Sequence, residues 1–348
     1  MPYTAEVAAA VRQFALPDKL GFGAVNAPVM FSAEWHDQKW GPGQLLPHGP
    51  IQILPGARAL QYGELVFEGL KAYRIGQPQP NLFRPDANFG RMKLSAQRLS
   101  MPAVPEALFF EGIEAVTRAC AAFIPSNSGQ SLYLRPFVFG TESGYLLRNS
   151  TTFRFMVIAN PVEAYASGTP TVAIERRDVR AAIGGVGAAK TSANYAASLR
   201  GSTAAVAGGH AVALWLDATS HRYIQELSGM NFWAVIDGEL HTPELDTAIL
   251  PGVTRDSLIQ LARHLDFVVH ERQMDIDELL TQISSGRCSE IFSCGTAAII
   301  MPISALADSD NLYKPQQTNV VAGRLREALL AIQERRAPDP FNWIRIIS

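Results

Sequence analysis

The chain has 348 residues, of which 47% are hydrophobic and 18% are charged, and its formal net charge is -2. A chain of this length is longer than the chains that usually fold around a single hydrophobic core, so we expect two domains. The near balance of charge predicts no binding to nucleic acid or to an anionic membrane surface, and the apolar runs fall far short of a membrane span.

The first part of the chain mixes strands with helices. One predicted helix covers residues 87–100, because Phe89, Met92, Ala96 and Leu99 recur on one helical face. A second helix is expected over residues 106–123, and strands are expected over residues 29–35, 131–140 and 152–160. Residues 1–163 are therefore predicted to form a small N-terminal α+β domain.

A connector is expected between the two domains. The composition shifts to proline, alanine, serine, glycine and threonine from Pro161 to Pro170, and we place the connector at residues 164–177. A large C-terminal domain, again of mixed α/β type, is predicted over residues 178–348. Its expected strands cover residues 211–217, 232–236, 267–272 and 289–294, and its expected helices cover residues 194–207, 254–265, 275–284 and 318–335.

The cysteines indicate a reducing compartment. Cys120, Cys288 and Cys294 are an odd number without paired spacing, which argues against a disulfide framework and against a zinc site. The first 20 residues lack the pattern of a targeting signal. A cytoplasmic location and no bound metal are therefore expected.

One stretch, residues 184–195, places a single lysine, Lys190, among glycines, alanines and small hydroxyl residues. The stretch holds no acidic side chain that could pair with its ammonium group. A lysine that must react as a neutral amine needs such surroundings, so Lys190 is a candidate Schiff-base former. A flexible surface loop that carries a lysine is the commoner explanation for this stretch taken alone.

Three segments carry groups that could bind a phosphate. Residues 249–256 enter a helix through a Pro-Gly turn with Thr254 as the expected N-cap, although most such turns bind nothing. Residues 293–298 end a strand in small residues whose amides can approach a ligand closely. Arg91, on a predicted helix, is the type of residue that clamps a phosphate with two N–H groups, while a solvated arginine is the commoner outcome.

Glu226 stands at the end of an apolar strand. A buried carboxylate beside a pyridine nitrogen keeps that nitrogen protonated and so makes the ring an electron sink. A surface glutamate at a turn is the commoner alternative for this residue.

Taken together, these segments resemble the branched-chain amino-acid aminotransferases, members of the fold-type IV family of pyridoxal-phosphate enzymes. The resemblance covers almost the whole chain and keeps the family's order. The matching segments are Phe22-Gly23, Glu34-Trp35, Tyr62 with Phe67 to Tyr73, Phe83 to Pro85, Asn88 to Arg91, Tyr133 to Pro136, Gly184 to Tyr195, Glu226 to Asn231, Leu250 to Arg255, and Gly295 to Ala297.

This resemblance implies an α+β fold of two mixed domains and pyridoxal 5′-phosphate as the cofactor. It also implies reversible transfer of an amino group between L-leucine, L-isoleucine or L-valine and 2-oxoglutarate, by a homodimer. On the cofactor side, Lys190 would form the internal aldimine and shuttle the substrate proton, Tyr195 would hydrogen-bond the phenolic oxygen, and Glu226 would pair with the ring nitrogen. The implied phosphate cradle consists of Arg91, Val253, Thr254 and Thr296.

On the substrate side, the resemblance implies that the amides of Thr296 and Ala297 bind the α-carboxylate. Aromatic walls suit a branched aliphatic side chain, because its burial is favourable by roughly 0.8 kcal/mol per CH₂ group. The implied walls are Phe22, Tyr62, Phe67 and Tyr133. Arg135 would accept the second carboxylate of glutamate, and simple alternation of core and surface along its strand is the alternative for Tyr133 and Arg135.

Two positions depart from the family pattern. Ala298 and Met301 stand where some members carry a redox pair of cysteines, so thiol regulation of that form is not expected. Gly229 stands where some relatives carry threonine near the cofactor ring. Any tuning of the ring by that threonine is therefore not carried over to this chain.

Rival functions stay open from the sequence. D-amino-acid aminotransferases and aminodeoxychorismate lyases share the fold, the lysine and the glutamate. A non-catalytic module that binds a phosphorylated metabolite would need only the cradle at Arg91, Thr254 and Thr296.

Overall fold

The computed structural model of the protein describes residues 3–164, 168–316 and 319–348. Contacts divide the chain into two compact units. The first contains Met1–Ala166, Ala189–Ser192 and Ala331–Ser348, and the second contains Ser167–Ala188 and Ala193–Leu330. The second unit therefore differs from the predicted domain 178–348. Within the predicted connector 164–177, residues 171–175 form a strand and residues 165–167 lie outside the described residues.

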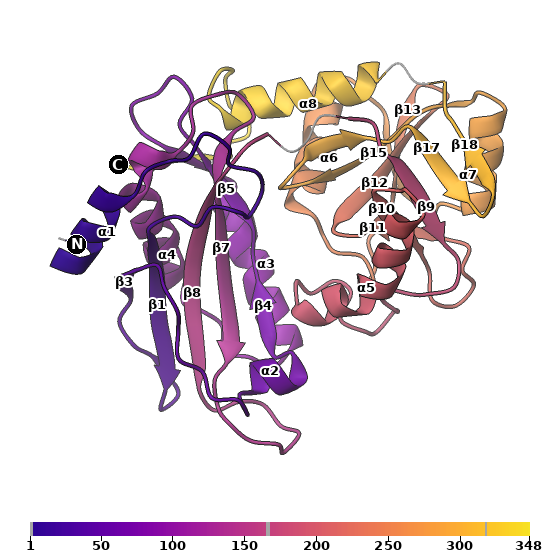
Figure 1. Ribbon diagram of the computed structural model, residues 1–348. Helices are drawn as coiled ribbons and strands as arrows, with labels where there is room; N and C mark the ends of the chain where they lie inside the picture. Colours follow the sequence, from indigo (N-terminus) through magenta and orange to yellow (C-terminus); the bar gives the residue numbers. More distant parts are fainter. Residues whose placement is uncertain (1–2, 165–167, 317–318) are drawn as a thin grey trace. The chain divides into compact units, whose positions relative to one another are not determined.

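An antiparallel sheet of nine strands forms the body of the first unit (Figure 1). The strand order is β19-β6-β5-β7-β8-β1-β2, with β3 paired to β1 and β4 paired to β7. The strands are β1 (Val29–His36), β2 (Lys39–Trp40), β3 (Gln44–Pro47), β4 (Leu65–Phe67), β5 (Leu70–Tyr73), β6 (Asn81–Phe83), β7 (Ser131–Gly140), β8 (Phe153–Val162) and β19 (Ile344–Ile346).

Helices cover one face of this sheet. Helix α4 (Glu106–Ala119) contacts β1, β7 and β8, and it buries Phe109, Ile113 and Val116 against Phe155 of β8. Helix α3 (Pro85–Arg98) adds Met92 to the same core. The predicted helix 106–123 is too long, because the α-helix ends at Ala119 and residues 121–123 form a short 3₁₀ turn.

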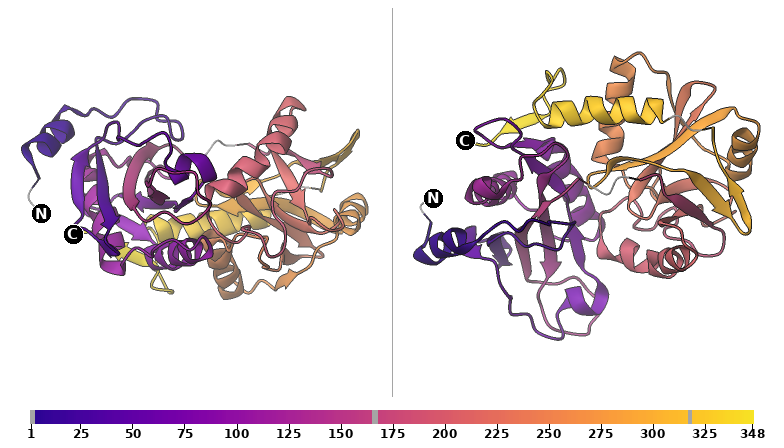
Figure 2. Two further views of the ribbon diagram at one scale, coloured as in Figure 1. Left: turned by 90° about the horizontal axis from the view of Figure 1, so that it is seen from below. Right: turned by 45° about the horizontal axis from the view of Figure 1, so that its top comes forward.

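The opposite face of the sheet carries a smaller apolar cluster. Successive residues of a strand point to opposite faces, so Met30, Phe139 and Met156 lie on the face away from α4 and pack together there. Two short helices complete the unit, α1 (Ala5–Gln13) and α2 (Arg58–Tyr62). Helix α1 and the C-terminal residues 331–348 both belong to this unit, as the two views of Figure 2 show.

A mixed sheet of ten strands forms the body of the second unit. Its order is β14-β13-β12-β11-β10-β9-β17-β18, and β15 pairs with β12 and β16. The strands are β9 (Thr171–Glu175), β10 (Val212–Leu216), β11 (Ile224–Leu227), β12 (Met230–Ile236), β13 (Glu239–Pro243), β14 (Val269–Arg272), β15 (Cys288–Gly295), β16 (Ile299–Pro302), β17 (Ala305–Asp308) and β18 (Asn311–Tyr313).

Four helices accompany this sheet: α5 (Ser192–Ala207), α6 (Val253–His264), α7 (Ile276–Ser284) and α8 (Val320–Gln333). Leu279 and Ile283 of α7 recur at helical spacing and enter a core with Phe232 of β12 and Ile291 of β15. No helix in the described part of the chain is long and apolar enough to cross a membrane.

Candidate active site

Lys190 is held against strand β4 of the first unit. The N–H of Phe67 donates to the carbonyl oxygen of Lys190 at 3.0 Å, and the N–H of Lys190 donates to the hydroxyl of Ser95 at 2.9 Å. Thr191 forms a bridge with Val66 and donates its hydroxyl to the carbonyl of Leu65. The Nζ atom lies 4.8 Å from the centre of the Phe67 ring, within the range of a cation–π contact. The lysine is thus half-buried and anchored on both sides, and is not part of a loose loop.

Aromatic side chains and an arginine gather around Phe67. The rings of Phe22 and Tyr133 meet edge to face at 5.2 Å, and the guanidinium of Arg135 lies 4.6 Å from the centre of the Phe67 ring. Arg135 also donates from Nη2 to the hydroxyl of Tyr133 at 3.1 Å. Gly69 makes room for that hydroxyl, because a Cβ at this position would lie 2.0 Å from it. Four of the predicted substrate residues therefore cluster with Lys190 in one unit.

Tyr62, the remaining predicted aromatic wall, contacts a different segment. It ends helix α2, it is 45% exposed, and its hydroxyl donates to the carbonyl oxygen of Tyr145 at 2.6 Å. Tyr145 belongs to a loop, residues 143–147, which carries three consecutive exposed apolar side chains. The hydroxyl of Tyr62 is therefore bound to this loop.

Arg91, predicted to bind phosphate, is buried and paired with a carboxylate that sequence reasoning did not single out. Its Nε and Nη2 atoms donate to the two carboxylate oxygens of Glu68 at 2.7 Å and 2.8 Å. Asn88, one turn earlier on α3, donates to the same carboxylate at 2.7 Å. The alternative of a solvated helix arginine is therefore wrong, since only 7% of Arg91 is exposed.

In the second unit, Glu226 is buried in strand β11 and not exposed at a turn. Its Oε1 atom lies 2.5 Å from Nη2 of Arg180, a residue that sequence reasoning missed. Asn231, its partner across the β11–β12 hairpin, donates to Oε2 at 3.3 Å and to the carbonyl of Leu250 at 3.0 Å. This ion pair and the amide of Asn231 fix the carboxylate beside the segment that leads into α6.

Helix α6 begins at Val253, so its N-cap is Gly252, and the expected cap role of Thr254 is wrong. Val253 and Thr254 lie in the first turn and are both buried. A side chain at the cap would displace the amide of Asn231, because a Cβ there would lie 2.0 Å from its Oδ1 atom. The start of this helix presents backbone N–H groups and the positive end of the helix dipole, a favourable setting for an anion.

Thr296 and Ala297 lie in the turn between β15 and β16. The residue after this turn region, Ile299, has a φ of 64°. A β-branched side chain in that left-handed region is a true outlier, and such strain persists only where the surrounding structure enforces it. Tyr195 lies in the first turn of α5 and is partly exposed.

The loop that precedes Lys190 is packed tightly inside the second unit. Asn194 donates to the carbonyl of Val186 at 2.8 Å, and the N–H of Ala188 donates to the carbonyl of Thr247 at 2.9 Å. Gly187 permits this approach, since a Cβ there would lie 2.3 Å from the carbonyl oxygen of Ala248. Because no side chain fits in this space, the position requires glycine.

The three cysteines are unpaired and buried, as expected for Cys294. Burial raises the pKa of each of these thiols to about 12. They therefore stay protonated at neutral pH and are poor nucleophiles.

One group of potential metal ligands, Glu239, His241 and His270, lies on β13 and β14 of the second unit. The two imidazole rings stack, with centres 4.6 Å apart and planes inclined by 20°. One potential ligand atom from each of the three residues lies within 4.8 Å of the others. Arg272 also donates to Nδ1 of His241 at 3.1 Å. In the structure the group is therefore a hydrogen-bonded stack, in which Arg272 already occupies Nδ1 of His241.

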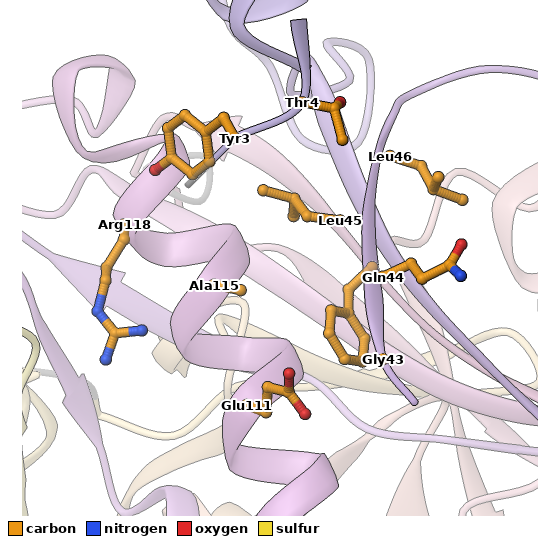
Figure 3. A pocket seen from close by; sticks show the side chains of 10 residues that line it. Tyr3, Thr4, Gly43, Gln44, Leu45, Leu46, Glu111, Ala115 and Arg118 are labelled. Atoms are coloured by element: carbon orange, nitrogen blue, oxygen red, sulfur yellow. The ribbon is translucent and has the colours of Figure 1, made fainter. Parts of the chain in front are cut away.

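A hollow of about 600 Å³ lies in the first unit (Figure 3). Its walls come from the residues before α1, from β3 and from α4, including Thr4, Leu45 and Ala115. None of the predicted site residues lines it.

Comparison with known proteins supports the expected family. Residues 65–306 match the model of the family described as amino-transferase class IV. The branched-chain-amino-acid aminotransferase of Mycolicibacterium smegmatis is 40% identical over 96% of this chain and 94% of its own length. The probable branched-chain-amino-acid aminotransferase of Staphylococcus aureus is 40% identical over 93% of this chain and 92% of its own.

The fold also matches solved structures. The branched-chain amino acid aminotransferase of T.th., crystallised with pyridoxamine 5′-phosphate, has a TM-score of 0.75 at 29% identity. The match covers 91% of this chain and 98% of that one. The expected α+β fold of fold-type IV is therefore confirmed.

Proposed function

Since this chain belongs to the class IV aminotransferase family, we infer that it is a pyridoxal-phosphate-dependent branched-chain amino-acid aminotransferase. It transfers an amino group reversibly between L-leucine, L-isoleucine or L-valine and 2-oxoglutarate. The observation that carries the proposal is the anchoring of Lys190 on β4, with its Nζ atom over the ring of Phe67. A lysine fixed in this way can form a covalent bond to a carbonyl compound.

The residues present fit pyridoxal phosphate. Its dianionic phosphate requires a cation and backbone N–H groups. The first unit offers Arg91 as the cation, and the second unit offers the N–H groups at the start of α6, at Val253 and Thr254. Its ring nitrogen requires a carboxylate, and Glu226 is buried and held by Arg180. When bound, the cofactor supplies an electron sink for the bonds at the substrate Cα atom. The residues proposed to hold it are Arg91, Lys190, Tyr195, Glu226, Val253, Thr254 and Thr296.

The chain's own residues would handle the proton and the substrate. Lys190 carries the proton from the substrate Cα atom, since an amine can act as general base and then as general acid. The amides of Thr296 and Ala297 bind the α-carboxylate. Phe22, Phe67 and Tyr133 form an apolar wall for the side chain, and Tyr62 is the fourth aromatic residue proposed to contact it.

The proposed substrates agree with compounds bound by a relative. Structures of the T.th. enzyme contain 4-methylvaleric acid, a branched aliphatic acid, and N-(5′-phosphopyridoxyl)-L-glutamate. For glutamate, the second carboxylate needs a cation in the substrate pocket. Arg135 is suited to this, because its Nε atom is buried without a hydrogen-bond partner among the described residues.

Replacing Lys190 tests the assignment. The Lys190→Ala variant should lose both the visible absorbance of the bound cofactor and the turnover of L-leucine with 2-oxoglutarate. The matched control is Lys93→Ala, at an exposed position of α3, which should retain both. Turnover of D-alanine in preference to the three branched-chain substrates would instead favour the D-amino-acid rival, and cofactor binding without any turnover would favour the binding module.

We also infer that the protein is a homodimer and works in the cytoplasm. Leu54 and Leu60 are largely exposed, as are Tyr145, Leu146 and Leu147, and a hydrogen bond from Gly144 N to Gly56 O joins the two segments. An apolar surface of this kind is typical of a protein interface. The unpaired buried cysteines fit a reducing compartment.

Light scattering tests the dimer. The Leu146→Glu, Leu147→Glu double variant should shift the mass in solution from dimer toward monomer. Leu94→Glu, which changes an exposed leucine on α3, should leave the mass unchanged. A monomeric unmodified protein at micromolar concentration would contradict the proposal.

A further inference from the structure

Glu68 is a fully buried carboxylate of the first unit, which also contains Lys190. It follows Phe67 directly, and its N–H donates to the carbonyl oxygen of Pro136 on β7 at 2.7 Å. Its carboxylate accepts hydrogen bonds from Arg91, from Asn88 and, at 3.1 Å, from the N–H of Gly69. A buried charge is costly unless it is paired, so this degree of pairing is what the position requires.

The carboxylate of Glu68 is ionised at neutral pH. Burial by itself would raise its pKa, but the charge of Arg91, the hydrogen bonds from Arg91 and Asn88, and the charge of Lys190 together lower the pKa below the ordinary value. The negative charge of Glu68 therefore acts on two residues of the proposed cofactor site, Arg91 and Lys190.

The pairing with Glu68 also fixes the orientation of the Arg91 guanidinium. Both oxygens of Glu68 are engaged by one edge of the guanidinium, formed by Nε and Nη2. Since the guanidinium is planar, this contact sets the plane of the group and turns its other edge, formed by Nη1 and Nη2, away from Glu68. That second edge has the spacing that binds two oxygens of a phosphate.

We propose that Glu68 is a positioning residue that orients the guanidinium of Arg91 for the cofactor phosphate. The inference rests on the proposed function, in which Arg91 binds that phosphate. Asn88 takes part from the same face of α3, because it holds one oxygen of Glu68. Glu68 thus determines how well the site distinguishes a phosphorylated cofactor from one that lacks the phosphate.

Comparing two ligands of the apoenzyme tests the proposal. Affinities for pyridoxal 5′-phosphate and for pyridoxal, which lacks the phosphate, are measured by absorbance titration of full-length protein. In the Glu68→Gln variant the affinity for pyridoxal 5′-phosphate should fall about tenfold, as expected when a charge-assisted hydrogen bond is misaligned. The affinity for pyridoxal should change by less than about twofold.

Two further variants test whether the effect of Glu68→Gln acts through Arg91 and whether it is specific to Glu68. Arg91→Met should abolish most of the preference for the phosphorylated ligand, and adding Glu68→Gln to it should cause no further loss. Glu334→Gln is the matched control, because Glu334 is also fully buried in the first unit and paired with an arginine, Arg336, at 2.6 Å. It should lower thermal stability without changing the ratio of the two affinities.

Equal losses for both ligands in Glu68→Gln, or a continued loss in the Arg91→Met background, would overturn the proposal. If Glu68→Gln does not fold, Glu68→Asp is measured instead. It retains the charge but shortens the side chain, and it should reduce the affinity ratio by a smaller factor, whereas an unchanged ratio would count against the idea. An unmodified protein that binds no pyridoxal 5′-phosphate would refute the proposed function itself.

Discussion

Each unit contains a buried carboxylate that an arginine holds in place. Glu68 is held by Arg91 in the first unit, and Glu226 is held by Arg180 in the second. A buried ion pair contributes little net stability, but removal of one partner leaves a charge without its counter-charge. At the scale of single residues, each buried carboxylate therefore depends on the arginine that pairs with it.

Replacing Arg180 tests this dependence. The Arg180→Met variant keeps the apolar length of the side chain but removes the charge beside Glu226, and it should lose about 3–5 kcal/mol in the free energy of unfolding. Denaturant unfolding measures the change. Arg287→Met is the control, since Arg287 pairs with Asp237 at the surface and its loss should alter unfolding little. A variant as stable as the unmodified protein would show that Glu226 does not need Arg180.

The stacked histidine His241 makes stability depend on pH. Burial, together with the charges of Arg272 and His270, lowers the pKa of His241 from an ordinary value of 6.5 to about 4. Between these two values the unfolded chain binds the proton and the folded protein does not. Stability should therefore fall as the pH drops from 6.5 toward 4.

The His241→Gln variant should reduce this loss by on the order of 1–2 kcal/mol, after allowing for the solvent that still reaches the ring. Urea unfolding at pH 7.5, 6 and 4.5 provides the comparison. His36→Gln, at a mostly exposed position, serves as the control. Parallel stability curves for His241→Gln and the unmodified protein would exclude His241 as the source.

The local sequence alone leaves two explanations for Lys190 and for Glu226, a functional one and a commoner structural one. Their proposed roles come from the resemblance to a family whose segments recur in order along the chain. Glu68 and Arg180 do not stand out, because their significance depends on partners that are distant in the sequence. Arg180 meets Glu226 only once the second unit has folded, and no local pattern reports that pairing.

At the scale of elements, close packing of the backbone explains the glycines before Lys190. Gly187→Ala should destabilise the protein by about 2 kcal/mol or more, because the new Cβ would overlap the backbone of Ala248. Gly323→Ala, at an exposed position in the first turn of α8 with open space around it, should stabilise the protein by roughly 0.5–1 kcal/mol. The midpoint temperature of thermal unfolding should fall in the first variant and rise in the second. A shift in the same direction for both variants would refute the packing argument.

Long elements could be predicted from the sequence, whereas short ones could not. The strand expected at residues 131–140 is β7, because ten residues of alternating and apolar character leave little ambiguity. Strands β4, β6 and β19 have three residues each, too few to show a period of two. They form because neighbouring strands offer backbone hydrogen-bond partners, which is a property of the folded unit.

For the whole molecule, the C-terminal residues complete the first sheet. Strand β19 pairs with β6, Trp343 packs on Phe83 and Arg84, and Ile347 is buried. Truncation after Pro340 should therefore destabilise the first unit by at least about 4 kcal/mol, because the loss of one buried tryptophan side chain alone usually costs about this much.

Hydrogen exchange measures this effect locally. In the truncated protein, amides of β5 and β6 should lose protection before those of β12 and β15. Ile346→Thr, an exposed position of β19, should have little effect and serves as the control. Equal protection of β6 with and without the C-terminus would contradict the prediction.

The discontinuous make-up of the first unit has a consequence during synthesis on the ribosome. Its sheet lacks β19 and the Lys190 segment until residues 189–192 and 331–348 have been made, although residues up to 166 emerge much earlier. At roughly 5–20 residues per second, the interval lasts on the order of ten seconds or more. Throughout that time β6 presents an unpaired edge, so the nascent chain should need protection from aggregation that the finished protein does not.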